Sequence, residues 1–97
     1  MKQMIELAKC MIICTDGTVK THYFKGTMPV LKEMQSIVDG HIEFVRFSPM
    51  QSMVVDEEGL IKNKPINKAA MSFLNRNGRD DVIISGNVFV ISNKFIN

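Results

Sequence analysis

The sequence predicts an α+β fold in which a mainly antiparallel sheet, with an N-terminal β-hairpin, carries one or two helices packed on one face. The chain has 97 residues, the size of one small domain. It contains no internal repeat and no Pro/Gly-rich linker, so we expect a single α+β domain over residues 1–97. Hydrophobic residues make up 45% and charged residues 23%, as in ordinary globular proteins. The predicted elements follow the order β-β-α-β-β-α-β-β, which is typical of this fold class.

The hairpin is predicted between residues 9 and 25. An apolar run ends at Thr15, Asp16-Gly17 follows, and a β-prone run continues to Phe24. Asp-Gly suits the positive φ angles of a type I′ turn, whose twist matches that of a hairpin.

A helix is predicted between Thr27 and Gly40. Thr27 is a candidate N-cap, Pro29 suits the first turn, and Gly40 is a C-terminal stop signal. Apolar residues at helical spacing form one stripe, which we expect to face the core. These residues are Val30, Leu31, Met34, Ile37 and Val38.

The next two strands are predicted at His41–Phe47, rich in β-branched and aromatic residues, and at Ser52–Asp56. Glu58-Gly59 turns the chain, and Leu60-Ile61 is a candidate segment for pairing back. These signals extend the antiparallel sheet beyond the hairpin.

A second helix is predicted after Pro65, with Asn67 available as its cap and Asn77-Gly78 at its end. Strands are then predicted at Val82–Ser85 and Val88–Ser92. Gly86-Asn87, another positive-φ signal, separates them.

Composition argues against several classes of protein. The longest apolar runs are far shorter than the ~18 residues that a membrane span needs. The first nine residues carry Glu6 between two lysines and lack the apolar core of a secretion signal, so we expect a cytoplasmic location. Cys10 and Cys14, four residues apart on one strand, would lie roughly 13 Å apart, too far for a disulfide. We expect both to be small buried residues.

Motifs of catalysis and metal binding are missing. The sequence has no Cys-x-x-Cys, His-x-x-x-His or His-Glu-x-x-His spacing, and no phosphate-binding glycine loop. His22 and His41 are a poor metal set, so we expect neither a metal nor a cofactor. Acidic residues cluster at two turns, where we expect them to be solvated and without the shifted pKa values of acid/base catalysts. They are Asp56, Glu57, Glu58, Asp80 and Asp81. The chain is therefore expected not to be an enzyme.

Positive residues suggest an anion-binding site instead. Arg46 lies between aromatic residues on a predicted strand, a composition used to stack on bases or hold phosphate. Lys62, Lys64 and Lys68 fall in a stretch without acids, beside Asn67 at a helix start. The alternative interpretation is a solvated loop, with Arg46 lying over a half-exposed sheet. A net charge of +2 is too weak to indicate nucleic-acid binding.

Residues 31–92 resemble an uncharacterised family catalogued as domain of unknown function 3846, which occurs in bacteriophages, plasmids and mobile regions of bacterial genomes. Four stretches carry the resemblance. They are Gly40-His41-Ile42-Glu43-Phe44-Val45, Met53-Val54-Val55-Asp56-Glu57-Glu58-Gly59, Pro65-Ile66-Asn67-Lys68-Ala69-Ala70 and Asp81-Val82-Ile83-Ile84-Ser85-Gly86-Asn87-Val88. Pro65-Ile66 stands where many members have two prolines, and Ser85 displaces a glycine.

The resemblance implies a context, a bacterial host cell, and no established activity. Phage proteins of this size commonly inhibit host defence, either by sequestering a nucleotide signal or by covering a host protein. We therefore expect a non-enzymatic, homo-oligomeric binding protein for a small anionic ligand, with Arg46, Lys62, Lys64, Asn67 and Lys68 as candidate ligand-binding residues. A protein-binding inhibitor of a host enzyme is the alternative, and a DNA-associated regulator ranks third.

Overall fold

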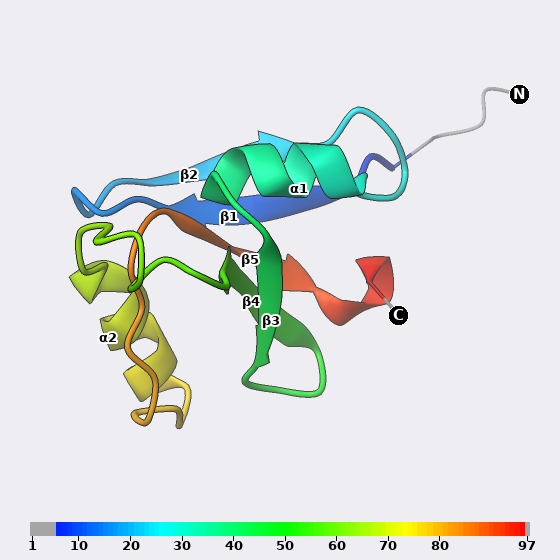
Figure 1. The fold of residues 1–97 in the computed structure, drawn as a ribbon. Coiled ribbons are helices and arrows are strands. Elements are labelled where there is room, and N and C mark those ends of the chain that lie inside the picture. The colour runs from blue at the N-terminus through cyan, green and yellow to red at the C-terminus, as the bar shows by residue number, and fades with distance from the viewer. Residues whose placement is uncertain (1–5, 97) are drawn as a thin grey trace, which may run out of the picture.

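The computed structural model describes residues 6–96. Five strands are present in this part of the chain: β1 (Lys9–Ile13), β2 (Val19–Tyr23), β3 (Ile42–Arg46), β4 (Gln51–Asp56) and β5 (Val88–Ser92). The helices are α1 (Leu31–Val38) and α2 (Lys68–Arg76), and a 3-10 turn follows at Asn93–Phe95. All neighbouring strands pair antiparallel, in the order β2-β1-β5-β4-β3 (Figure 1). The predicted α+β fold and N-terminal hairpin are confirmed.

Local turn chemistry forms the hairpin of β1 and β2. Gly17 adopts φ +90°, which a residue with a side chain rarely does. Asp16 Oδ1 accepts hydrogen bonds from the backbone N–H and the hydroxyl of Thr18, at 2.9 and 2.6 Å. These bonds fix a three-residue loop in which Gly17 has a positive φ and Asp16 does not, so the turn is not the expected type I′ turn. The loop sets Ile13 opposite Val19 and Lys9 opposite Tyr23.

The two helices cover opposite faces of the sheet. Met34 and Val38 of α1 pack with Phe89 on one face. Ala70 and Leu74 of α2 pack on the other face, in a second core that contains the neighbouring β5 residues Val88 and Val90. Side chains alternate across a strand, so consecutive apolar residues of β5 supply both cores. The expectation that the helices share one face is therefore wrong for α2, and Figure 1 shows the helices well apart.

Helix α1 starts later than the sequence indicated. Its N-cap is Val30, in extended conformation and without a side-chain cap, so Thr27 and Pro29 precede the helix. Only part of the predicted stripe is buried, since Val30 and Leu31 are exposed. The helix ends at Asp39, which takes the left-handed conformation at φ 56° immediately before Gly40.

Residues 82–85 do not form the predicted strand. Both edges of β5 are occupied, by β1 and by β4, so no edge is left for a strand that follows the Gly86-Asn87 turn. The segment pairs with the start of α2 instead: Asn67 N–H donates to Ile84 O at 2.8 Å, and Gly86 N–H donates to Pro65 O at 2.8 Å. Leu60-Ile61, the other segment expected to pair, lies in a turn.

The face that carries α2 is only partly covered. Helix α2 packs near one end of β1 and β5, over Ile13 and Val88. Toward the other ends of these strands the same face is open, and Met11 and Tyr23 lie there on one side of the hairpin. We call this area the open half of the sheet.

Candidate functional site

Two of the predicted anion-binding lysines converge on a carboxylate of the same chain. Asp56 ends β4 and its side chain is 0% exposed. Lys62 Nζ lies 2.9 Å and Lys64 Nζ 2.6 Å from Asp56 Oδ2. Lys64 Nζ also donates to the carbonyl oxygens of Val38 and Asp39, at 2.7 Å each. Because these carbonyls lie at the end of α1, where a helix leaves acceptors unsatisfied, the two lysines hold α1 and β4 together.

Asp56 is ionised far below its usual range. Burial by itself would raise its pKa, because it removes water from the charged form. Hydrogen bonds from Lys64, from the backbone N–H of Glu58 and from Lys62 outweigh burial and lower the pKa from 3.8 to about 2. Asp56 was expected in a solvated cluster, and that expectation is wrong for this residue. Glu57 and Glu58 beside it are exposed, as expected.

Asn67 has a structural role in the fold. Its side chain is fully buried. The amide nitrogen donates to Ile13 O at 3.0 Å and to Gly86 O at 2.9 Å, and the amide oxygen accepts from the Ala70 N–H at 2.9 Å. The last of these bonds is the predicted N-cap of α2. The hydrogen-bonding groups of this amide are thus directed into the protein, where they join β1, α2 and the turn before β5.

Arg46 and Lys68 lie apart from this ion-pair cluster. Arg46 is exposed at the end of β3, on the face of α1, and its backbone oxygen accepts a hydrogen bond from Arg79 Nη1 at 2.7 Å. Lys68 is exposed at the first residue of α2, on the other face. The structure therefore brings Lys62 and Lys64 together, but it does not bring the five predicted residues into one pocket.

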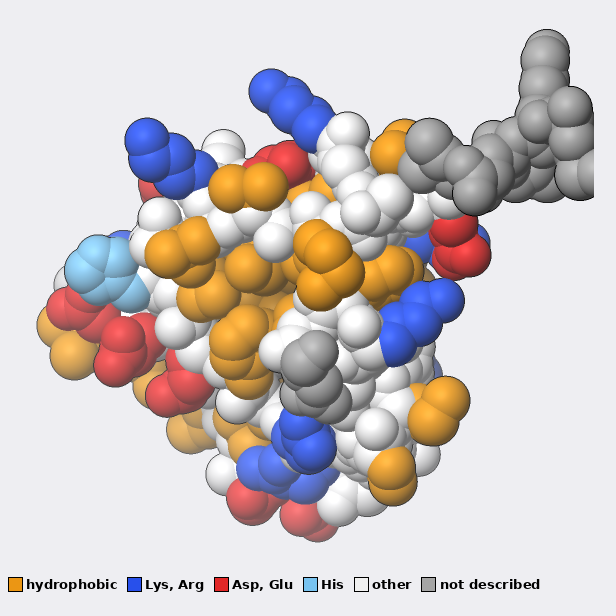
Figure 2. Space-filling view, turned by 90° about the vertical axis from the view of Figure 1, so that its right-hand side faces the viewer, with side chains coloured by type: hydrophobic (Ala, Val, Ile, Leu, Met, Phe, Trp, Pro, Cys, Tyr) orange, Lys and Arg blue, Asp and Glu red, His pale blue; other side chains and the backbone are white. Residues whose placement is uncertain are grey.

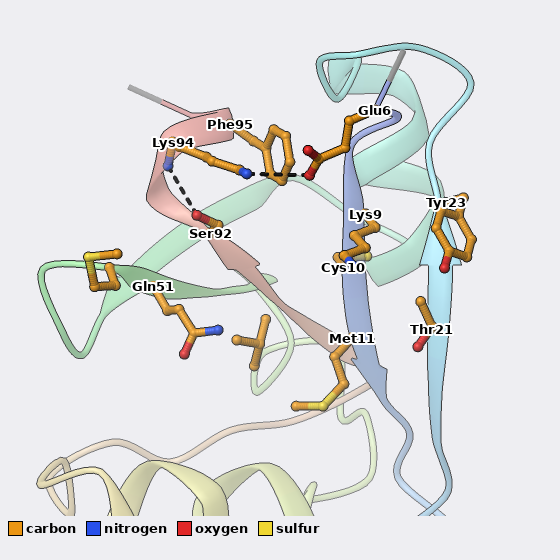
Figure 3. A pocket seen from close by; sticks show the side chains of 12 residues that line it. Glu6, Lys9, Cys10, Met11, Thr21, Tyr23, Gln51, Ser92, Lys94 and Phe95 are labelled. Atoms are coloured by element: carbon orange, nitrogen blue, oxygen red, sulfur yellow. Dashed lines mark hydrogen bonds and ion pairs between the residues drawn. The ribbon is translucent and has the colours of Figure 1, made fainter. Parts of the chain in front are cut away.

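A cavity lies on the open half of the sheet. No site was predicted there from the sequence. The volume of the cavity is about 460 Å³. Figure 3 shows that β1 and β2 form one wall and that β4, β5 and the C-terminal turn form the other. Lining residues used below are Lys9, Met11, Thr21, Tyr23, Gln51, Val90, Ser92, Lys94 and Phe95. None of the five predicted ligand-binding residues is among those that line it.

The cavity combines apolar surface with a few polar groups. Met11 and Val90 form its floor from adjacent strands. Tyr23 is 60% exposed at one side. On the other side, Lys94 Nζ lies 4.9 Å from the centre of the Phe95 ring and 3.4 Å from Glu6 Oε1.

The sequence model of the family described as "Domain of unknown function (DUF3846)" matches residues 8–95 of the 97-residue chain. The chain belongs to this family. No curated protein and no solved structure matches it.

The stretches that carry the family resemblance meet around the buried polar groups of the DUF3846 domain. A Cβ added at Gly40 would lie 2.6 Å from Asp56 Cγ, and one at Gly59 would lie 2.9 Å from Ser85 O. The Asn67 amide bonds Gly86 O from the third stretch to the fourth. All three junctions are therefore tightly packed or joined by a buried hydrogen bond, which indicates that these residues maintain the fold.

Neither helix of the described chain, residues 6–96, is long and apolar enough to cross a bilayer. In the same part of the DUF3846 domain, no three histidine, cysteine or acidic side chains lie together where they could hold a metal ion. Cys10 and Cys14 are both free thiols, the first buried and the second half-buried.

The low pKa of Asp56 predicts a loss of stability in acid. A carboxyl group whose pKa is lower in the folded chain than in the unfolded one stabilises the fold above pH 3.8 and loses this effect as the pH falls toward 2. The shift corresponds to roughly 2 kcal/mol at neutral pH. Asp56→Asn should therefore be at least about 2 kcal/mol less stable at pH 7, with a flatter decline between roughly pH 5 and 2.

Urea denaturation at a series of pH values measures this effect. Asp81→Asn is the matched control, because Arg79 lowers the pKa of this carboxyl at an exposed position, where an ion pair contributes little. Equal pH profiles for the wild-type chain and Asp56→Asn would contradict the stabilising role of the Asp56 ion pairs.

Proposed function

We propose that the DUF3846 domain is a non-enzymatic binding protein that takes a small anionic ligand with a planar ring, of the nucleotide class, on the open half of its sheet. The cavity carries this proposal. Its volume of about 460 Å³ lies within the range of small-molecule sites, roughly 300–1,000 Å³. Apolar side chains with a few polar groups are also what such sites contain.

The two lysines at the cavity are suited to phosphate. Lys9 enters it from the start of β1 and Lys94 from the C-terminal turn (Figure 3). The ion pair of Lys94 with Glu6 is exposed at both partners, so it contributes little stability, and Lys94 is available to exchange Glu6 for a ligand oxygen. A doubly charged phosphate between the two ammonium groups would gain charge-assisted hydrogen bonds.

The ring of Tyr23 is suited to a base. It is exposed on the cavity side of an edge strand, where a planar ligand can stack on it. Stacking of a base on an aromatic side chain is worth about 1–3 kcal/mol. Thr21 and Gln51 supply hydrogen-bonding groups for the edge of the ring.

The thiol of Cys10 faces away from the cavity. Cys10 packs in the core beneath α1, on the opposite face of β1 from Lys9 and Met11, and burial, reinforced by the charge of Glu33, raises its pKa to about 12. The group therefore stays protonated at neutral pH, and a thiol is a much weaker nucleophile than a thiolate.

Calorimetry against a panel of cyclic dinucleotides and ADP-ribose derivatives tests the proposal. For the ligand that binds, we expect Tyr23→Ala to weaken affinity about 10-fold or more, because the stacking surface is lost. Lys9→Ala should weaken it and reduce its salt dependence. The matched control is Lys68→Ala, an exposed lysine away from the cavity, which should bind as the wild-type chain does. An absence of heat with every compound would overturn the proposal.

A second candidate function is inhibition of a host protein by surface contact. Apolar side chains gather at the end of the molecule that faces the viewer in Figure 2. A hollow of about 350 Å³ on the face of α1 is lined by Met28, Pro29, Met34, Phe44, Phe95 and Ile96. Exposed apolar areas of this kind mark protein-binding surfaces. Phe44→Glu should abolish retention of such a protein while leaving nucleotide binding intact.

In the cell, we propose sequestration of a nucleotide signal of host defence, by a homo-oligomer in the cytoplasm of a bacterial host. This role rests on the family resemblance to phage and mobile-element proteins and on the ligand chemistry of the cavity. A phage that lacks the gene should then lose protection only in hosts whose defence uses a nucleotide that the purified chain binds.

A further inference from the structure

Strand β2 is an edge of the sheet, and its outward backbone groups are known from its pairing with β1. Phe24 N–H donates to Ala8 O at 2.8 Å, and Cys14 N–H donates to Thr18 O at 2.9 Å. In an antiparallel pair, hydrogen-bonded and non-bonded positions alternate, so the even-numbered residues of this segment bond to β1. The N–H and C=O groups of Val19, Thr21 and Tyr23 therefore point away from the sheet.

We propose that β2 pairs antiparallel with β2 of a second copy of this chain, with Thr21 opposite Thr21 of that copy. In this register Val19 lies opposite Tyr23 of the second copy. Residues with outward groups then face one another along the whole strand, and every outward N–H and C=O on both strands gains a partner. Unprotected edges of this kind are where sheets associate.

The side chains on both faces favour this register. On the cavity face, Val19 is 55% and Tyr23 is 60% exposed, and the pairing sets each against the other to cover apolar surface. On the face of α1, Lys20 comes opposite His22 of the second copy. His22 Nε2 lies 3.0 Å from Glu33 Oε2, so the ammonium group meets a carboxylate held in place by the histidine.

The neighbouring registers are less favourable. A shift by two residues in one direction places Lys20 opposite Lys20 of the second copy, and like charges directly opposite destabilise a sheet. A shift in the other direction places His22 opposite His22 and removes Lys20 from Glu33. A shift by one residue would set residues whose N–H and C=O groups point outward against residues whose N–H and C=O groups already bond to β1. The sequence Val-Lys-Thr-His-Tyr is thus complementary to itself only around Thr21.

The pairing would bring the cavities of the two copies close to the junction, and a role of the junction in ligand binding rests on the proposed function. Two antiparallel strands in this register are related by a two-fold axis perpendicular to the sheet, so both cavities open on the same side. Thr21 and Tyr23 line the cavity and also form the junction. Val19 of the second copy would extend the cavity wall beside Tyr23, and a ligand with two phosphates could contact both subunits.

Disulfide trapping tests the register without any ligand. Cα atoms of a directly opposite, hydrogen-bonded pair lie about 5.5 Å apart, which suits a disulfide. Thr21→Cys should therefore give a covalent dimer under mild oxidation. Val19→Cys is the matched control: it lies on the same strand and face, but the two copies of residue 19 would be roughly 13 Å apart. Val19→Cys and the wild-type chain, with its own two cysteines, should stay largely uncross-linked.

Sedimentation of the full chain is the second measurement. The wild-type chain of 11.0 kDa should sediment as a dimer. Thr21→Pro should be monomeric yet folded, because it removes an outward N–H and leaves the bonds to β1 intact, whereas Thr21→Val should remain dimeric. A monomeric wild-type chain, a dimeric Thr21→Pro variant, or equal cross-linking of Thr21→Cys and Val19→Cys would each overturn the proposal. None of these outcomes depends on whether a nucleotide binds.

Discussion

Replacement of Asn67 by alanine is expected to cost about 3–5 kcal/mol of stability, a large part of the ~5–15 kcal/mol of a small domain. Loss of the N-cap bond to Ala70 accounts for about 1 kcal/mol. The larger effect comes from Ile13 O and Gly86 O, which each lose the buried hydrogen bond from the Asn67 amide, at about 1–2 kcal/mol each. Thermal denaturation should show Tm lower by roughly 15–25 °C.

Asn75→Ala is the matched control, because Asn75 lies exposed on the same helix. It should change stability by less than about 0.5 kcal/mol. A ligand-binding role for Asn67 predicts the opposite pattern, in which Asn67→Ala stays as stable as the wild-type chain and loses only affinity. That result would contradict the role assigned to its amide here.

Replacement of Gly40 by alanine is expected to destabilise the fold by about 3 kcal/mol. The backbone of Gly40 is not in the left-handed region, so alanine meets no conformational penalty there. The cost is steric and electrostatic: the added Cβ would lie 2.6 Å from three atoms of the Asp56 carboxyl group, which would have to leave Lys62 and Lys64.

A double-mutant cycle identifies the cause. If the clash with the carboxylate is responsible, Gly40→Ala should cost less than about 1 kcal/mol in an Asp56→Ala background. Gly26→Ala, where the nearest atom would be 4.0 Å away, should be neutral in the wild-type chain. Additive losses in urea denaturation would show that Gly40 acts independently of Asp56.

Features of the fold that depend on neighbouring residues could be predicted from the sequence. Asp16-Gly17 forms the turn of the hairpin, and Asn67 caps α2, because both signals act within three residues of chain. The strand expected over residues 82–85 depends on whether an edge of β5 is available. Since β1, far away in the sequence, takes that edge, no local pattern could have predicted the outcome.

The candidate site could be predicted less well, for the same physical reason. A lysine-rich segment predicts a binding patch as long as the partners of its lysines are unknown. Lys64 pairs with Asp56, and it bonds two carbonyl groups at the end of α1 that lie 25 and 26 residues earlier in the sequence. The cavity draws its lining from both ends of the chain and from β4. An exposed tyrosine alternating with Thr21 on a strand was the available signal, and it is a weak one.

The central claim is that the open half of the sheet binds the ligand, while Lys62 and Lys64 maintain the fold. Backbone and methyl NMR spectra of the full chain, titrated with whichever nucleotide gives heat in calorimetry, test it directly. We predict that the resonances that shift belong to Met11, Thr21, Tyr23, Gln51 and Val90. Shifts confined to Lys62, Lys64 and Lys68, with the cavity residues unmoved, would contradict it.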